Sequence, residues 1–187
     1  SGTVIELTNA GGIATFDSLR IDRKGAKILT ASSGITSSIA SASFTILNAN
    51  ATLVRVETAA DGSGIVVPSQ SVTPLNPIVV YSITRDAFDN FIENVATGTW
   101  TLQDITGGVV AGDLVAAGDN RSATFTGHFV GSAQIQATSP SLTSVNSGTI
   151  TVIPGTARRL VFVQQPSNGI AGAVIAPPVT VQVRDTA

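Results

Sequence analysis

Ile78–Asn90, IVVYSITRDAFDN, is the stretch of sequence that decides the fold. Its apolar residues alternate with polar ones up to an Arg-Asp pair, and the same pattern returns near the C-terminus in VTVQVRDTA, residues 179–187. Successive side chains of a strand point to opposite faces, so Val79, Tyr81 and Ile83 are expected to share one face, which we predict to be the inward one. The two predicted strands that end in an Arg-Asp pair therefore indicate two copies of one structural unit.

The composition of the chain indicates an all-β protein. The 187 residues include 18 Gly and 43% hydrophobic residues, which is enough to build a core, and no long stretch has helical periodicity. A net charge of -2 with only ten basic residues argues against nucleic acid as a partner. No apolar run is long enough to cross a bilayer, so no membrane insertion is expected. The absence of Cys excludes disulfides and thiolate metal ligands.

Short segments of the sequence recur at a nearly constant spacing of 106 to 109 residues. The matched segments are ATF at 14–16 and 123–125, Gly25 and Gly131, Ala31 and Ala137, 35–37 and 142–144, and 44–46 and 150–152. A second set, ATLVRV from Ala51 and ARRLVFV from Ala157, is offset by a similar amount, and the two Arg-Asp pairs lie 99 residues apart. This constancy predicts a tandem repeat.

We therefore predict three units: the C-terminal half of a repeat at 1–47, a complete repeat at 48–153, and the N-terminal strands of a further repeat at 154–187. A repeat of about 100 residues with frequent turn signals has the size of an immunoglobulin-like β-sandwich. Trp100 is expected in its core. The strands predicted for the complete unit are Thr52–Thr58, Ile78–Arg85, Thr99–Gln103, Ser122–Thr126, Ser132–Thr138 and Gly148–Ile153.

Two segments carry a resemblance to a known family. LVFVQQPSNGIAGAVIAPPVTVQVRD, Leu160–Asp185, resembles the opening of a bacterial immunoglobulin-like repeat, and residues 12–46 resemble its closing half. Such repeats are strung along large surface and secreted proteins, including invasin- and intimin-type adhesins. The resemblance implies tandem sandwiches, an extracellular or cell-surface location in bacteria, and a structural role in a filament, stalk or adhesin. It specifies no ligand. Members of the family continue after the Arg-Asp strand, whereas this chain ends at Ala187.

The two incomplete ends are predicted to complement each other. A half-sandwich exposes apolar faces and strand edges, and the C-terminal piece supplies the front strands that the N-terminal piece lacks. Further copies of the chain, or adjacent repeats, are therefore the expected partners. Strand addition between copies would build an open filament. The favoured interpretation is that the completing strands belong to one longer polypeptide of tandem repeats, and a further alternative is that the ends are frayed. The predicted assembly residues are Leu160, Phe162, Val179, Val181 and Val183.

Asp86, Asp89 and Asn90 form an oxygen-rich cluster at the end of a predicted strand. Calcium takes six to eight oxygen ligands, so these residues are weak calcium candidates. Turn-forming side chains that bind nearby backbone N–H groups explain the same residues without a metal, and we favour that interpretation. The same choice applies to Asp17, Asp22 and Asp61.

No arrangement of residues predicts catalysis. His128 is the only histidine, so one chain cannot assemble a catalytic triad or a multi-histidine zinc site. We therefore expect neither enzymatic activity nor a cofactor. The alternative function is a carbohydrate- or cell-binding module of a secreted protein, which would require an exposed aromatic face. The single Trp and the single Tyr, Trp100 and Tyr81, are both expected to point inward.

Overall fold

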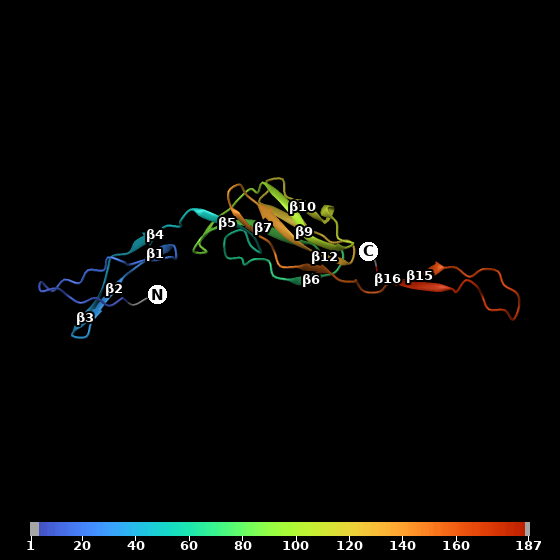
Figure 1. Cartoon of the computed structure of the whole chain (residues 1–187), viewed down its shortest axis with the longest axis horizontal. Helices are drawn as coiled ribbons and strands as arrows, with labels where there is room; N and C mark the ends of the chain where they lie inside the picture. The colour runs from blue at the N-terminus through green and yellow to red at the C-terminus, as the bar shows by residue number, and fades with distance from the viewer. Residues whose placement is uncertain (1–3, 186–187) are drawn as a thin grey trace.

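A computed structural model describes residues 4–185 of the chain. Figure 1 shows an elongated molecule in which a central body of packed strands carries a smaller β piece at each end. We call these parts the head (residues 4–47), the central sandwich (51–152) and the tail (154–185). Within the described range the only helix is a single 3-10 turn, Ala111–Asp113, and no helix is long and apolar enough to cross a membrane.

The first sheet of the central sandwich has the strand order β10-β11-β7-β5-β13, with β8 paired to β7. All its pairs are antiparallel except β5 with β13, which run parallel. Its strands are β5 (Ala51–Glu57), β7 (Ile78–Asp86), β8 (Phe91–Asn94), β10 (Leu114–Ala116), β11 (Ser122–Phe125) and β13 (Thr143–Val145).

The second sheet has the order β6-β14-β12-β9, in which only β14 and β6 run parallel. The first and last strands of the sandwich, β5 and β14, thus each have one parallel neighbour. The strands of this sheet are β6 (Gln70–Val72), β9 (Thr99–Gly107), β12 (Gly131–Thr138) and β14 (Ile150–Val152).

The two sheets enclose one hydrophobic core. Val56 from β5 and Phe125 from β11 meet Ile135 from β12 and Val152 from β14, and all four side chains are fully buried. Along β12 the burial alternates residue by residue, as expected for a strand with one face against a core. Trp100 packs against this core from β9 but is only half-buried. The central part of the chain is therefore a β-sandwich.

All six strands predicted for the central unit are present in the structure, and the predicted unit boundaries at 48 and 153 fall in the connections on either side of it. Four further strands, β6, β8, β10 and β13, were not predicted. Each has only three or four residues, so its sequence shows no clear alternation, and its place is set by pairing with a longer strand.

The structure corrects the face predicted for β7. Val80, at 1% exposure, lies in the core, whereas Val79 is 51% exposed and Tyr81 is half-buried. The expectation that Val79, Tyr81 and Ile83 point inward is therefore wrong: Ile83 is fully buried, but on the face opposite to Val80 and outside the core cluster. Ser82 is also fully buried because its hydroxyl donates to a backbone carbonyl, which lets a polar residue leave the solvent.

The head and the tail consist of small two-stranded sheets. In the head, β1 (Gly25–Lys27) pairs with β4 (Phe44–Ile46), and β2 (Thr30–Ser33) pairs with β3 (Thr36–Ala40). In the tail, β15 (Arg159–Gln164) pairs with β16 (Thr180–Arg184). All three pairs are antiparallel.

Candidate functional site

The tail hairpin has the same register as the pair β5 and β7 of the central sandwich. Val56 lies opposite Ser82 in the sandwich, and Phe162 lies opposite Val181 in the tail. Val56 and Phe162 are 106 positions apart, and Ser82 and Val181 are 99 apart. These are the spacings found in the sequence repeat, so the tail hairpin is the structural counterpart of β5 and β7.

One face of the tail hairpin is apolar and open to solvent. Val54 and Val56 are fully buried in the sandwich, whereas their tail counterparts Leu160 and Phe162 are 71% and 51% exposed. Val181 and Val183 of β16 are 49% and 61% exposed, and Val179, just before this strand, is 40% exposed. We call this surface the tail face; it consists of the five predicted assembly residues, Leu160, Phe162, Val179, Val181 and Val183.

The head repeats the hydrogen bonds of the back half of the sandwich. The Ser41 backbone N–H donates to the carbonyl of Leu29 (2.8 Å), and the Leu29 N–H donates to Ser41 Oγ (3.0 Å). In the sandwich, Ser147 N–H donates to the carbonyl of Ile135 (2.9 Å), and Ile135 N–H donates to Ser147 Oγ (2.8 Å). The head is therefore the counterpart of β12 and the segment that follows it.

The head also exposes residues whose counterparts are buried. Leu29 is 41% exposed, whereas its counterpart Ile135 is fully buried. Phe16, in the repeated ATF segment, is 40% exposed, whereas Phe125 is fully buried. Within the described residues, Leu29 and Phe16 of the head are thus open at positions whose sequence counterparts lie in the core of the sandwich.

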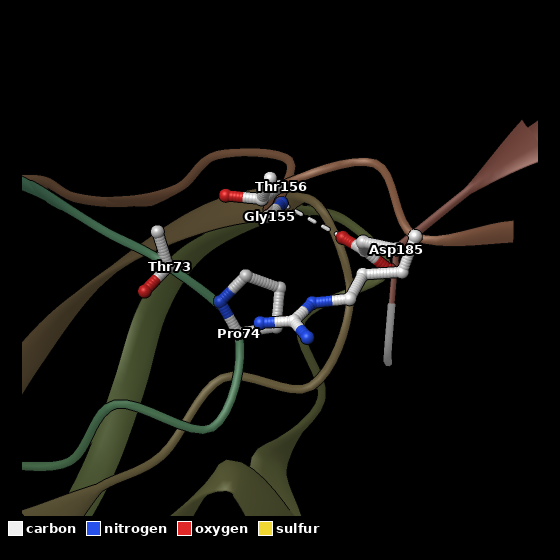
Figure 2. A pocket seen from close by; sticks show the side chains of 6 residues that line it. Thr73, Pro74, Gly155, Thr156 and Asp185 are labelled. Atoms are coloured by element: carbon white, nitrogen blue, oxygen red, sulfur yellow. Dashed lines mark hydrogen bonds between the residues drawn. The ribbon is translucent and has the colours of Figure 1, made fainter.

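The two Arg-Asp strand ends hold the linkers that lead into their own units. Asp86 Oδ2 accepts a hydrogen bond from the Ala49 N–H (2.9 Å), and Asp185 Oδ2 accepts one from the Gly155 N–H (2.7 Å). Figure 2 shows the second contact beside a pocket that Pro74 also lines. Each carboxylate fixes the chain just before the first strand of its unit.

Asp86 is fully buried and its carboxylate is surrounded by N–H donors. Oδ1 accepts hydrogen bonds from the backbone N–H groups of Phe88 and Asn90, and Oδ2 accepts one from Asn90 Nδ2, all at 2.9 Å. Burial acts to raise the pKa of Asp86, but these bonds and the one from Ala49 outweigh it and lower the pKa to about 2. The contacts within 86–90 are those of a turn.

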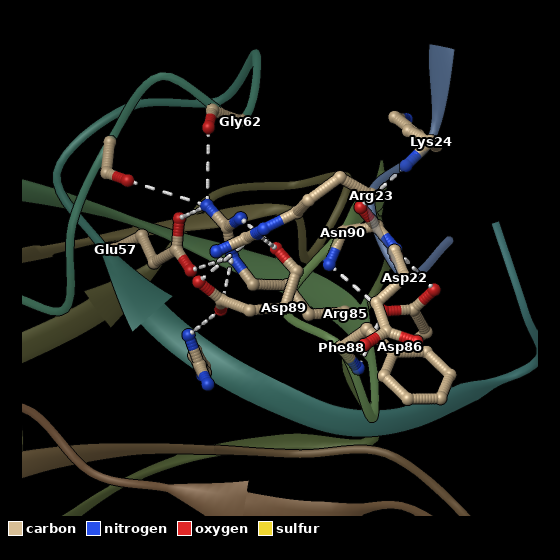
Figure 3. A network of polar contacts seen from close by, with 12 residues as sticks. Asp22, Arg23, Lys24, Glu57, Gly62, Arg85, Asp86, Phe88, Asp89 and Asn90 are labelled. Carbon is tan, nitrogen blue, oxygen red and sulfur yellow. Dashed lines mark hydrogen bonds and ion pairs between the residues drawn. The ribbon is translucent and has the colours of Figure 1, made fainter. Parts of the chain in front are cut away.

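Asn90 connects this turn to the head (Figure 3). Its Nδ2 donates to the carbonyl of Asp22 (2.7 Å), and its Oδ1 accepts a hydrogen bond from the Lys24 N–H (3.0 Å). Asn90 is only 5% exposed, so a single side chain is buried between two successive units. Its amide orients the head loop relative to the sandwich.

Asp89 lies among cations. It forms a short ion pair with Arg55 and longer contacts with Arg23 (3.8 Å) and Arg85 (3.9 Å). The three calcium candidates therefore contact N–H donors and guanidinium groups. Within residues 4–185 no group of three or more acidic or histidine side chains is arranged to hold a metal ion. Calcium binding stays a prediction to be tested.

Sequence reasoning missed a buried ion pair next to this cluster. Arg85 Nε and Nη2 bind the two oxygens of Glu57 at 2.6 and 2.7 Å, and the two side chains are 9% and 1% exposed. Arg85 Nη2 also donates to the carbonyl of Gly62 (3.1 Å). The hydrogen bonds with Glu57 raise the pKa of Arg85. The available signal was a charge, Glu57, at the end of the apolar alternation ATLVRVE.

The remaining polar candidates have local partners. His128 Nδ1 lies 2.6 Å from the buried carboxylate of Asp113. Asp22 pairs with Arg20 (2.6 Å) at the surface, and Asp61 accepts hydrogen bonds from Ser63, which lower the pKa of its carboxyl group. Of these residues, only Asp22 contacts the cluster around Asp86, through its backbone carbonyl, which accepts a hydrogen bond from Asn90.

Together these features define an all-β chain built around one β-sandwich, with an open apolar hairpin at one end. No family model matches the chain, and a comparison with curated proteins finds no match either.

Proposed function

We propose that the chain is a structural repeat unit of an extracellular bacterial filament, stalk or adhesin, in which immunoglobulin-like units follow one another end to end. The observation that carries this proposal is the recurrence of the Leu29–Ser41 hydrogen bonds in Ile135 and Ser147, 106 positions later. Sequence repetition alone can be compositional. Repetition of both the register and the side-chain hydrogen bonds supports repeated folding of one unit.

The contacts between the head and the sandwich support a role in which neighbouring units keep a fixed orientation relative to each other. Besides the contacts of Asn90, the Arg20 guanidinium lies over the Phe88 ring at 4.8 Å, and the Lys24 ammonium lies over the Phe91 ring at 5.2 Å. Cation–π contacts add to the polar bonds across the junction. A stalk or filament requires neighbouring units to be held in line in this way.

The alternative, a carbohydrate- or cell-binding module, has less support from the aromatic residues. Trp100 and Tyr81 are both half-buried, and the indole N–H of Trp100 donates to the carbonyl of Asn120 (3.2 Å). A stacking platform would offer an open ring face. The proposed extracellular location rests on the resemblance to bacterial surface repeats.

Two measurements on the monomer test the proposal: the shape of the particle and the resistance of the junction between head and sandwich to proteolysis. Small-angle X-ray scattering at a concentration where the chain is monomeric should give an elongated particle. Asn90→Ala should speed proteolytic cleavage of the head while the sandwich stays intact, because the head loses its buried bridge to the turn. Asn76→Ala, at an exposed position, is the matched control. A compact particle, or equal cleavage rates in the two variants, would contradict the proposal.

A further inference from the structure

We infer that the tail of one copy and the head of a second copy join to form an additional sandwich. The inference rests on the proposed function and names the partner of the tail face: a second copy of this chain. The tail supplies counterparts of β5 and β7, and the head supplies counterparts of the segments from β11 to β14. The two ends therefore contribute different strands of one sandwich, although neither, within the described residues, contains a counterpart of β8 or β9.

The open strand edges match. Among the described residues, β15 pairs only with β16, and β3 pairs only with β2, so each has one edge without a strand neighbour. In the central sandwich the counterpart of β15, β5, lies between β7 and β13. The residues of β3 include the counterpart of β13. Placing β3 of one copy beside β15 of another reproduces the neighbour relation of β13 and β5, and it requires β3 to separate from β2, because β12 and β13 lie in different sheets of the sandwich.

The sandwich also fixes the register of this contact. Thr143 lies beside Leu53 in the parallel pair of β13 and β5. The residues 35–37 and 142–144 match at a spacing of 107, but the hydrogen bonds of Ser41 and Ser147 on one side and of Leu29 and Ile135 on the other set the structural spacing at 106. Moving Thr143 back by 106 and Leu53 forward by 106 places Ser37 of one copy beside Arg159 of the other. The shift of β13 gives Ser37 and the shift of β5 gives Arg159. The inferred pair is therefore a specific one.

Within the described residues, the head and the tail of one molecule cannot reach each other. The head and the tail project from opposite ends of the central sandwich (Figure 1). A tail therefore meets the head of another copy, and that copy still has a free tail. Such a head-to-tail contact is heterologous and does not close on itself, so it propagates into a linear chain of molecules.

Disulfide trapping tests this register because the chain contains no cysteine. A Ser37→Cys chain is mixed with an Arg159→Cys chain under mild oxidation. The matched control mixes Ser37→Cys with Val161→Cys, two residues out of register. Two residues along a strand add about 6.6 Å, which takes the Cα atoms beyond the roughly 7 Å that a disulfide can span. Ser37 and Arg159 are polar and exposed, and Val161 is apolar and half-buried.

The in-register mixture should give a head-to-tail dimer about tenfold faster than the control mixture. Unchanged Trp100 fluorescence verifies that the sandwich stays folded in each variant. Equal rates in the two mixtures, or no cross-link in either, would overturn the inference. If no cross-link forms, but scattering gives an elongated monomer and Asn90→Ala speeds cleavage of the head, the inference fails and the proposed repeat function is retained. If the cross-linking, scattering and proteolysis experiments all fail, both the inference and the proposed function are refuted.

Discussion

Val181→Asp should abolish the association of copies through the tail face. Val181 is 49% exposed in the isolated chain and lies opposite Phe162, so the hairpin itself can accommodate a solvated carboxylate. In the additional sandwich the same position corresponds to Ser82, which is fully buried. The substitution therefore leaves the free chain folded and penalises only the assembled state.

The exposed fractions of the tail-face side chains determine how much association free energy the substitution removes. Its five apolar side chains are 40–71% exposed, and covering them contributes about 4–8 kcal/mol at 1.5–3 kcal/mol per fully buried side chain. Val181→Asp loses about 1 kcal/mol of this burial. It also places an unpaired carboxylate in the core, at a cost of several kcal/mol. A total near 4 kcal/mol corresponds to a dissociation constant about a thousandfold higher.

Light scattering across a dilution series measures the effect. The parent chain should grow with concentration into long species, and Val181→Asp should remain monomeric over the same range. Thr180→Asp introduces the same charge on the opposite face of β16, at a residue that is already polar and exposed and whose counterpart Tyr81 is only half-buried, and should assemble almost like the parent. If the two substitutions have equal effects, or if Val181→Asp still assembles, the assigned orientation of β16 is wrong.

Three further predictions concern the polar cluster and its surroundings. Glu57→Gln leaves the Arg85 charge buried without its partner and should lower the free energy of unfolding by about 3–5 kcal/mol in urea titrations followed by Trp100 fluorescence, whereas Glu93→Gln, at an exposed site, should change it little. The pKa of Asp86 is lowered from 3.8 to about 2, so its stabilising contribution is complete above pH 4 and is lost as the pH falls through 2. The melting temperature of the parent should therefore fall more steeply between pH 4 and pH 2 than that of Asp86→Asn; parallel profiles would show that Asp86 does not stabilise the fold. Since Asp86, Asp89 and Asn90 already contact N–H donors and guanidinium groups, calcium and a chelator should leave the melting temperature unchanged, and a calcium-dependent rise would support the metal alternative.

The longer strands of the fold were predictable because their side chains alternate. The alternation in Gly131–Thr138 and the repeat spacing identify the strands of the back half without any structure. The inward face of β7 was not predictable from alternation, since Val79 and Val80 are both apolar and Ser82 is polar yet buried. The repeat spacing contained a further signal: at a spacing of 99, Val179, Val181 and Val183 correspond to Val80, Ser82 and Thr84, the inward residues of β7, and not to Val79, Tyr81 and Ile83.

The candidate site was only partly predictable. The apolar residues in the sequences of β15 and β16 identify the tail face, because an isolated two-stranded hairpin cannot bury the side chains of both its faces. The pair of Glu57 and Arg85 depends on the register between β5 and β7, and the two residues are 28 positions apart. The bridge from Asn90 to the head depends on how two units meet. Such contacts are set by tertiary packing and leave no local pattern in the sequence.

The parallel neighbours of β5 and β14 have a mechanical consequence. The chain enters the sandwich through β5 at the head end and leaves through β14 at the tail end (Figure 1). A force that stretches the molecule pulls each strand along its own axis, and the hydrogen bonds to β13 and β6 lie across that direction. These hydrogen bonds must break at the same time under such a force, whereas the bonds of a strand that is peeled from one end break one after another. The sandwich therefore resists tension along the line in which its neighbours are joined, and single-molecule stretching from the two linkers should require more force than stretching that peels β5 from its C-terminal end.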